Sequence, residues 1–306
     1  MRVMRAALVA AAYALAPAEA AAAELSPPPT ATLQPVVTTS ELVVGGNRFA
    51  FVLLKDGSVL SARRAAVGLY DISGDDAQLL SVTPALYHPL EVIEGGRHVH
   101  VHPDGTRHLH DSATDVRGIY VAHVTLPRAG PWGVEISVEH APGVVETTRL
   151  SVDALPQSRA PLPGTAAPRS RNLVASDVSD LRVIDSSEPP DPRLHQTRIA
   201  DAIRQGRPQL IVFATPKYCT SRVCGPVLDV VRALIPAYRD RVAFVHEEIW
   251  QAGGMQRVSP TVEEWNLRSE PWIFIVDGDG VIRARFEGVT TRRELETVLR
   301  QTLRLP

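Results

Sequence analysis

The sequence lacks an excess of charge of either sign. Its 306 residues include 32 Lys and Arg against 34 Asp and Glu, which gives a formal net charge of -2. A balance this close to neutral provides no electrostatic attraction to nucleic acid or to another polyanion. We therefore expect no nucleic-acid partner. The length and the 44% hydrophobic content are sufficient for two domains with ordinary cores.

Long apolar runs are also absent. No stretch reaches the about 18 apolar residues that a membrane helix needs. The nearest approach is N-terminal, where Arg2 and Arg5 precede a small-residue apolar core over 6–16 and small-x-small motifs at 18–20 and 21–23. This order is typical of a secretory signal peptide. We predict a signal peptide over 1–23, no stable membrane span after its cleavage, and export to the periplasm or outside the cell. An uncleaved signal anchor is the alternative.

Cysteine is scarce, and its positions exclude two classes of protein. The only cysteines are Cys219 and Cys224. None lies beside the cleavage motifs, so we do not expect a lipid anchor. None lies in the first half of the chain either, which excludes the disulfide-stapled antibody type of β-domain. In the oxidising compartment that an export signal implies, two cysteines this close are expected to bond at least part of the time.

Short runs rich in β-branched or aromatic residues fill the first half of the chain. Glycine-rich turn signals separate them, a pattern that predicts an all-β sandwich over 41–153. An extended lead-in over 24–40 precedes it, and a Pro-rich linker over 154–171 follows. The stretch from Gly118 to Ile136 resembles the later strands of small exported immunoglobulin-like domains of the YtkA-like type. The expected strands are 42–44, 48–54, 65–72, 118–126, 132–140 and 144–152.

A second domain is expected over 172–306. Buried apolar runs alternate there with helical spacing, in the order strand, helix, strand, helix, β-hairpin, helix. The expected helices are 197–205, one from near Pro226 to 238, 260–265 and 291–303, and the expected strands are 209–214, 242–246, 272–277 and 281–286.

This second half resembles the thioredoxin fold over about 165–304. Three features carry the resemblance: Cys219 just past the first central strand, Ser269-Glu270-Pro271 before an apolar strand, and the tight turn between Val276 and Val281. The chain is similar to exported thiol–disulfide and SCO-like proteins. Their cysteine spacings are C-x2-C and C-x3-C, whereas this chain has C-x4-C. The fold class expected for the whole chain is thus two domains, an all-β sandwich followed by an α/β thioredoxin-like fold.

The resemblance also implies a substrate site around the thiols. Pro271 is expected to form a cis peptide bond and to face the cysteines, and the backbone at Glu270 is expected to pair with an extended substrate peptide. Thr215, Pro216 and Tyr218 are expected at the rim of this site.

The cysteine spacing limits the local structure. Residues five apart on a regular helix lie about 7.5 Å apart along the axis and on different faces, which is incompatible with a disulfide. The segment between Cys219 and Cys224 must then be a loop, and the helix must begin at Cys224 or later. We favour Cys219 as the nucleophile and Cys224 as the resolving thiol. The helix start argues for the reverse, since a helix N-terminus favours a thiolate. An inert structural disulfide is the third reading.

A histidine-rich segment over 97–111 is the second candidate site. Pro103-Asp104-Gly105 suits a three-residue hairpin loop. That loop would pair His102 with Thr106, His100 with His108 and His98 with His110, and so gather the imidazoles on one face. Clustered imidazoles suit copper or zinc, and a solvated polar hairpin is the alternative. The candidate ligands are His98, His100, His102, His108 and His110.

Three functions follow from these features. The first is an exported thiol–disulfide oxidoreductase that acts on a protein thiol or disulfide and requires no cofactor. The alternative is a copper-handling protein that uses the histidine hairpin with or without the cysteines. The third is a non-enzymatic binding scaffold with a structural disulfide. Peroxidase chemistry fits less well, because Thr215 lies four residues before Cys219 rather than in a Pro-Thr-Cys arrangement.

Overall fold

In a computed structural model of the chain, the described residues are 33–62, 64–90, 97–101, 107–111, 118–219, 223–251, 255 and 257–305. The predicted signal peptide, most of the lead-in, and His102 lie outside them. Thr32–Pro306 form one compact unit. Within the described part, no helix combines the length and the apolar character that crossing a membrane requires.

The first half of the described chain forms a large, mainly antiparallel sheet. Its strand order is β1-β3-β9-β6-β5-β10-β11-β2, and β4 pairs with β3. Alternation explains its interior: along β10, Trp132, Val134, Ile136 and Val138 are buried while the residues between them are partly exposed. The strands are β1 (Leu33–Val37), β2 (Leu42–Val43), β3 (Gly45–Lys55), β4 (Ser58–Val59), β5 (Arg64–Asp71), β6 (Gln78–Pro89), β9 (Gly118–Leu126), β10 (Gly130–Ala141) and β11 (Val144–Leu155).

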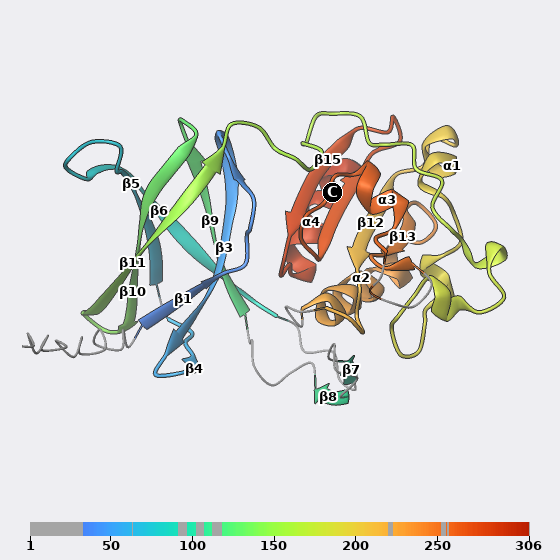
Figure 1. The fold of residues 1–306 in the computed structure, drawn as a ribbon, viewed down its shortest axis with the longest axis horizontal. Helices are drawn as coiled ribbons and strands as arrows, with labels where there is room; N and C mark the ends of the chain where they lie inside the picture. Colours follow the sequence, from blue (N-terminus) through green and yellow to red (C-terminus); the bar gives the residue numbers. More distant parts are fainter. Residues whose placement is uncertain are drawn as a thin grey trace, which may run out of the picture. The chain divides into compact units, whose positions relative to one another are not determined.

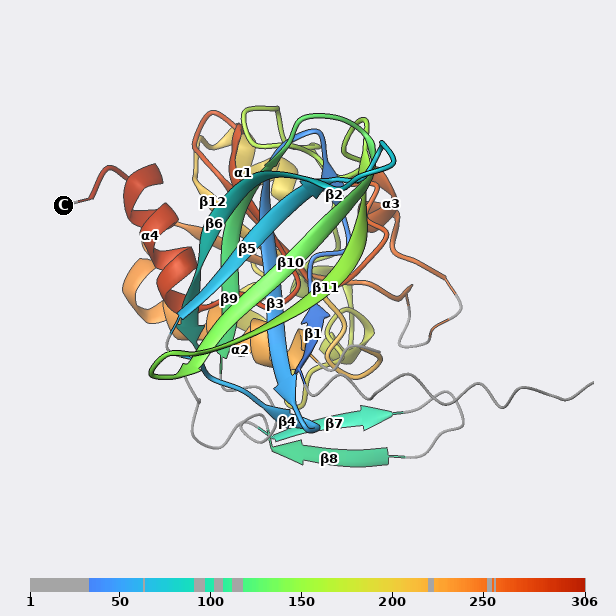
Figure 2. The same ribbon diagram turned by 90° about the vertical axis from the view of Figure 1, so that its left-hand side faces the viewer.

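Strand β6 makes this a single curled sheet. Its first part, from Gln78 to Ala85, pairs with β5, and its last part, from Leu86 to Pro89, pairs with β9. The strands that β6 joins therefore belong to one hydrogen-bonded surface. Figure 2 shows that surface bending so that β5, β10 and β11 cross in front of β3 and β9.

A four-stranded mixed sheet lies in the second half of the chain, in the order β13-β12-β14-β15 (Figure 1). All six residues of β12 are buried, as in a strand covered on both faces. One face packs against α2 and α4, and the other against α1 and α3. The elements are α1 (Ile199–Arg204), β12 (Gln209–Ala214), α2 (Cys224–Tyr238), β13 (Ala243–Glu248), α3 (Pro260–Glu264), β14 (Trp272–Val276), β15 (Ile282–Glu287) and α4 (Arg292–Thr302).

The predicted fold class is wrong, although many individual elements are confirmed. The protein is mostly β, with 42% strand and 20% helix, and its large sheet is one curled surface rather than a sandwich of two facing sheets. Only α2 and α4 of the described helices exceed six residues. The chain is therefore not a sandwich followed by an α/β thioredoxin-like domain. Local residue patterns predicted where most strands form. The long strand β6 was not predicted, and its pairing with both β5 and β9 determines the architecture.

A separate two-stranded sheet holds the histidine-rich segment. It consists of β7 (Arg97–Val101) and β8 (Arg107–Asp111). The backbone register pairs His98 with His110 and His100 with His108, which confirms the predicted pairing for those four positions.

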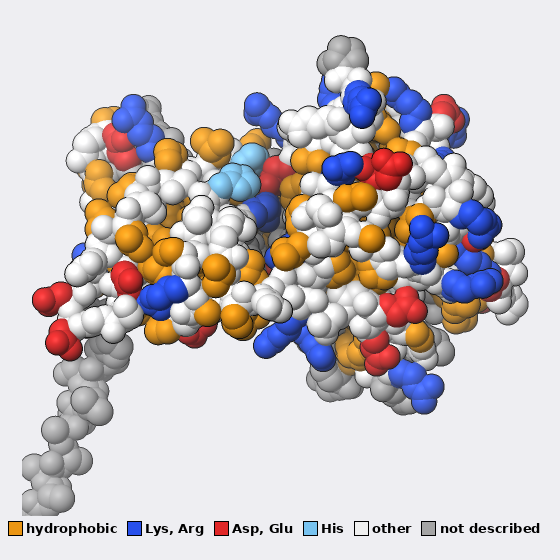
Figure 3. Space-filling model, turned by 90° about the horizontal axis from the view of Figure 1, so that it is seen from above, with side chains coloured by type: hydrophobic (Ala, Val, Ile, Leu, Met, Phe, Trp, Pro, Cys, Tyr) orange, Lys and Arg blue, Asp and Glu red, His pale blue; other side chains and the backbone are white. Residues whose placement is uncertain are grey.

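On the face shown in Figure 3, Lys, Arg, Asp and Glu side chains are interspersed among hydrophobic ones. This view agrees with the near-neutral composition and shows no field of a single sign.

Candidate thiol and metal sites

The two cysteines lie between a buried strand and a helix, as the sequence predicts. Strand β12 ends at Ala214, Cys219 follows a turn, and α2 begins at Cys224. The thiols are 1% and 0% exposed and are not joined in a disulfide. The Cys224 backbone N–H donates a hydrogen bond to Cys219 Sγ over 3.4 Å. The first residue of the helix thus presents its amide to the sulfur of Cys219.

The two thiols have different environments. Burial raises the pKa of Cys224 well above its ordinary value, the neighbouring Cys219 sulfur raises it further, and the Thr215 backbone amide acts weakly in the opposite direction. Cys224 is therefore the thiol that retains its proton. Cys219 is equally buried, but it accepts a backbone amide at the start of a helix, a position that favours a thiolate in general.

The residues expected around the thiols differ in how deeply they are buried. Pro271 follows a cis peptide bond, as expected, and precedes Trp272, which pairs with Phe213 near the end of β12. Thr215 and Pro216 are buried, whereas Tyr218 and Glu270 are half-buried. Burial raises the pKa of Glu270, and the charge of Glu248 adds to the effect.

A cavity of about 1060 Å³ lies beside this region. Val223, which precedes Cys224, and Glu270, which precedes Pro271, both contribute to its wall. Its remaining lining is largely apolar and includes Val36, Val52 and Leu54 of the curled sheet. The cavity is large enough for an extended segment of polypeptide.

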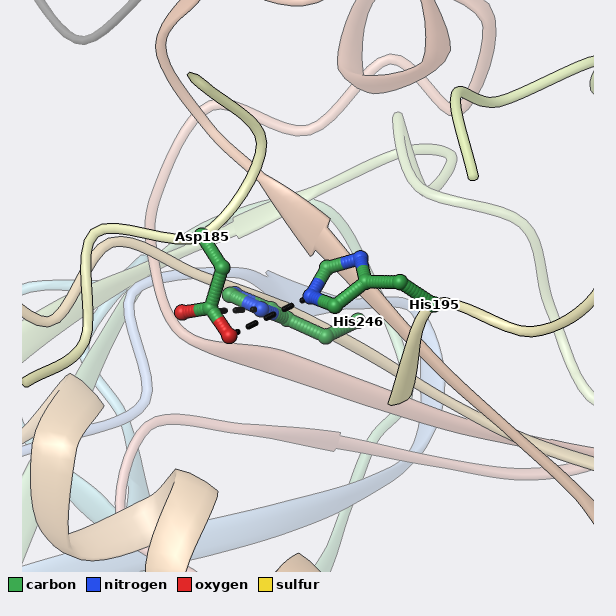
Figure 4. Close-up of side chains that lie close together, drawn as sticks. All are labelled: Asp185, His195 and His246. Atoms are coloured by element: carbon green, nitrogen blue, oxygen red, sulfur yellow. Dashed lines mark hydrogen bonds and ion pairs between the residues drawn. The ribbon is translucent and has the colours of Figure 1, made fainter. Parts of the chain in front are cut away.

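A second constellation joins Asp185, His195 and His246 (Figure 4). Asp185 follows a short 3-10 turn at Leu181–Val183, His195 follows another at Pro192–Leu194, and His246 lies on β13. Asp185 Oδ2 is 3.2 Å from His195 Nε2, and Asp185 Oδ1 is 3.6 Å from His246 Nδ1. One ligand atom from each side chain lies within 4.8 Å of the others, so this cluster can hold a metal ion.

Burial is the largest single influence on the pKa of each group in this cluster, but it decides the net direction only for His195. It opposes the charged form of Asp185, yet His246, His195 and Ser187 together hold the pKa of that carboxyl well below its usual range. Burial lowers the pKa of His195, and Asp185 offsets this only in part. Burial also opposes charge on His246, but Asp185 and Glu248 outweigh it and raise the pKa of His246. The cluster therefore favours a positive charge at His246.

Helix α2 connects the cluster with the thiols. Its N-terminus carries Cys224, and two turns later its Arg232 donates a hydrogen bond to Ser187 Oγ over 2.6 Å. Ser187 in turn donates from its backbone N–H to Asp185 Oδ1 over 2.9 Å. The same helix thus contacts both candidate sites.

The sequence analysis did not identify Asp185, His195 and His246 as a metal cluster. The segment that carries Asp185 and His195 contains Pro189, Pro190 and Pro192 and has the composition of a linker. One signal was available: His246, Glu247 and Glu248 end a strand that is otherwise apolar. Polar residues on a buried strand require partners, and the partners come from a distant segment.

The predicted histidine hairpin is described only in its backbone pairing, so its role as a metal ligand stays a prediction. No protein-family model and no curated protein matches this sequence.

Proposed function

We propose that this chain is a thiol–disulfide oxidoreductase that acts on protein substrates through Cys219 and Cys224. The observation that supports the proposal is the asymmetry of the pair. Cys219 accepts the first amide of α2, and burial holds the proton on Cys224. A nucleophile and a resolving thiol need this difference, because the thiolate is the attacking form.

The proposed reaction has two exchange steps. In the first, the Cys219 thiolate attacks one sulfur of a substrate disulfide, forms a mixed disulfide, and releases the other substrate sulfur as a thiolate. In the second, Cys224 loses its proton and attacks the Cys219 sulfur, which releases the remaining substrate thiolate. The substrate gains two electrons, and the Cys219–Cys224 pair becomes a disulfide. An external dithiol reverses that oxidation in each cycle.

The substrate of this reaction is a protein with an accessible disulfide in an extended segment. The cavity bordered by Val223 and Glu270 supports this choice, because it adjoins the residues that flank Cys224 and Pro271 and is mainly apolar. In this proposal Thr215, Pro216 and Tyr218 hold the cysteine loop, and export places the protein where disulfides persist.

Insulin reduction with dithiothreitol tests the proposal. We expect the wild type to accelerate the reaction and Cys219→Ser to fall to the uncatalysed rate. Cys224→Ser should accumulate a mixed disulfide with the substrate. Met255→Ser, which removes a sulfur at a position that is 38% exposed, is the control. Equal rates for the wild type and Cys219→Ser would refute the oxidoreductase function.

Metal handling, with copper or zinc as cargo, is the second candidate function. The Asp185–His195–His246 cluster shows that side chains suited to both ions occur in the chain, and the hairpin histidines are the proposed cargo ligands. The backbone register of the histidine hairpin also favours metal handling, because it pairs His98 with His110 and His100 with His108. Copper-loaded protein should then pass the ion to a chelating acceptor, and replacing the five hairpin histidines with alanine should slow this transfer. Transfer at an unchanged rate would exclude the hairpin from this function.

A further inference from the structure

We infer that Asp185, His195 and His246 form a resident site for a divalent transition-metal ion of the zinc type, separate from any cargo bound by the hairpin. The site does not depend on the proposed redox function, because neither cysteine belongs to it. Its support comes from the spacing of the donor atoms, their outer partners and the local charge.

The spacing of the donors is compatible with a coordination shell, although Asp185 and His195 also lie at hydrogen-bond distance. Ligands about 2.1 Å from a tetrahedral ion lie about 3.4 Å from one another. The Asp185 oxygens lie 3.2 Å from His195 Nε2 and 3.6 Å from His246 Nδ1, on either side of that value. A separation of 3.6 Å is too long for a hydrogen bond. Indeed, His246 Nδ1 is buried without a hydrogen-bond partner.

Outer partners orient two of the three ligands, His246 and Asp185, whereas His195 Nδ1 is buried without a hydrogen bond. His246 Nε2 lies 3.0 Å from the Ala214 carbonyl oxygen, so this nitrogen carries the hydrogen and donates it. Nδ1 then faces Asp185, where it can hold either a proton or a metal ion. Ser187 and Asp191 donate backbone N–H groups to the two carboxylate oxygens over 2.9 and 2.8 Å. Metal sites commonly orient a histidine ligand through such a bond to a backbone carbonyl.

The charge of the surroundings also favours a cation. Glu248 is 6% exposed and accepts the backbone N–H of Ser186, the residue next to Asp185. The nearby Asp191 is offset by Arg193 and Arg232. Glu248 therefore lies on the same strand as His246 and next to the loop that carries Asp185, so acidic side chains adjoin the two imidazoles.

Metal content and Co²⁺ spectroscopy test the inference on the full chain. Protein dialysed against EDTA is titrated with Zn²⁺, and a second sample with Co²⁺. The background carries Cys219→Ser, Cys224→Ser and alanine at the five hairpin histidines, which removes the other candidate ligands. His195→Gln and His246→Gln are the test variants. His123→Gln, at an exposed position on β9, is the matched control.

We expect the background protein and the His123→Gln control to bind about one Zn²⁺ per chain and to give the visible absorption of tetrahedral Co²⁺ without a thiolate band. Each test variant should bind at least about 100-fold more weakly, because loss of an outer partner alone costs 10- to 100-fold. Zn²⁺ should also raise the Tm of the unmodified protein, a readout that remains if a variant fails to fold. No binding and no rise in Tm, or equal binding by the test variants, would overturn the inference and leave a hydrogen-bonded His–Asp–His cluster.

Discussion

The order in which the two thiols ionise can be measured directly. Each single variant, Cys219→Ser or Cys224→Ser, leaves one thiol in the folded protein. We expect the thiol of Cys224 to react with iodoacetamide only at high pH, and the thiol of Cys219 to react at clearly lower pH. This difference is the basis of the proposed division into nucleophile and resolving thiol.

The size of the difference follows from the environments. Burial is the main cause of the raised pKa of Cys224. Cys224 stays buried in the Cys219→Ser variant, so this cause remains. A thiol whose pKa is raised by burial is largely protonated at neutral pH. An amide at a helix N-terminus contributes up to about 1–2 kcal/mol to a thiolate, which corresponds to about one pH unit. The two alkylation midpoints should therefore differ by more than about one pH unit.

The assay follows alkylation by mass spectrometry between pH 5 and 10. The midpoint of each profile is the quantity compared, because the absolute rate also depends on how easily the reagent reaches a buried thiol. The same variants unfolded in guanidinium are the control and should give equal midpoints. Equal midpoints in the folded variants, or a lower midpoint for Cys224, would refute the assignment of Cys219 as the nucleophile.

Two further predictions concern stability. Arg48 binds the Glu294 carboxylate over 2.9 and 3.2 Å with both side chains near 10% exposed, so Arg48→Met should lower the free energy of unfolding by about 3 kcal/mol in urea titrations. Burial opposes the charge of Glu294, but Arg48 outweighs burial and lowers the pKa of Glu294. The stabilisation by this ion pair is therefore present above pH 4.5 and lost as the pH falls. A difference in unfolding free energy between wild type and Arg48→Met that stays constant down to pH 2 would contradict this. Gly278→Ala should cost about 1–3 kcal/mol, because its Cβ would lie 2.6 Å from the Gly206 carbonyl oxygen, whereas Gly74→Ala, with open space, should leave Tm unchanged.

Elements with strong local signals could be predicted from the sequence. The apolar run that forms β12 and the proline near the start of α2 placed both elements at or within two residues of their observed bounds. A disulfide between Cys219 and Cys224 would have required the helix to begin no earlier than Cys224; the helix begins there, although the thiols are not joined. In each case the pattern of neighbouring residues was sufficient.

The partners of a strand are not contained in its local pattern. Strand β6 was missed because its apolar residues do not alternate cleanly with polar ones; Leu79, Leu80 and Val82 are all more than half exposed. Its pairing with both β5 and β9 turned an expected sandwich into one curled sheet. The metal cluster was missed for a related reason, since Asp185 and His195 meet His246 across more than 50 residues of chain, from a proline-rich segment.

The two candidate sites share one peptide group. The carbonyl of Ala214 accepts the hydrogen bond of His246 Nε2, and the amide of the same peptide, on Thr215, interacts with the Cys224 thiol. The parallel pairing of β12 with β13 fixes this arrangement, because Val212 and Ala214 lie opposite His246 and Glu248. Both strands are buried along their whole length, so neither can shift without breaking the sheet. The peptide between Ala214 and Thr215 therefore links the cluster to the Cys224 thiol in a buried setting. Cys219, whose sulfur accepts an amide of α2, also interacts with the Cys224 thiol, so both sulfurs belong to the same network.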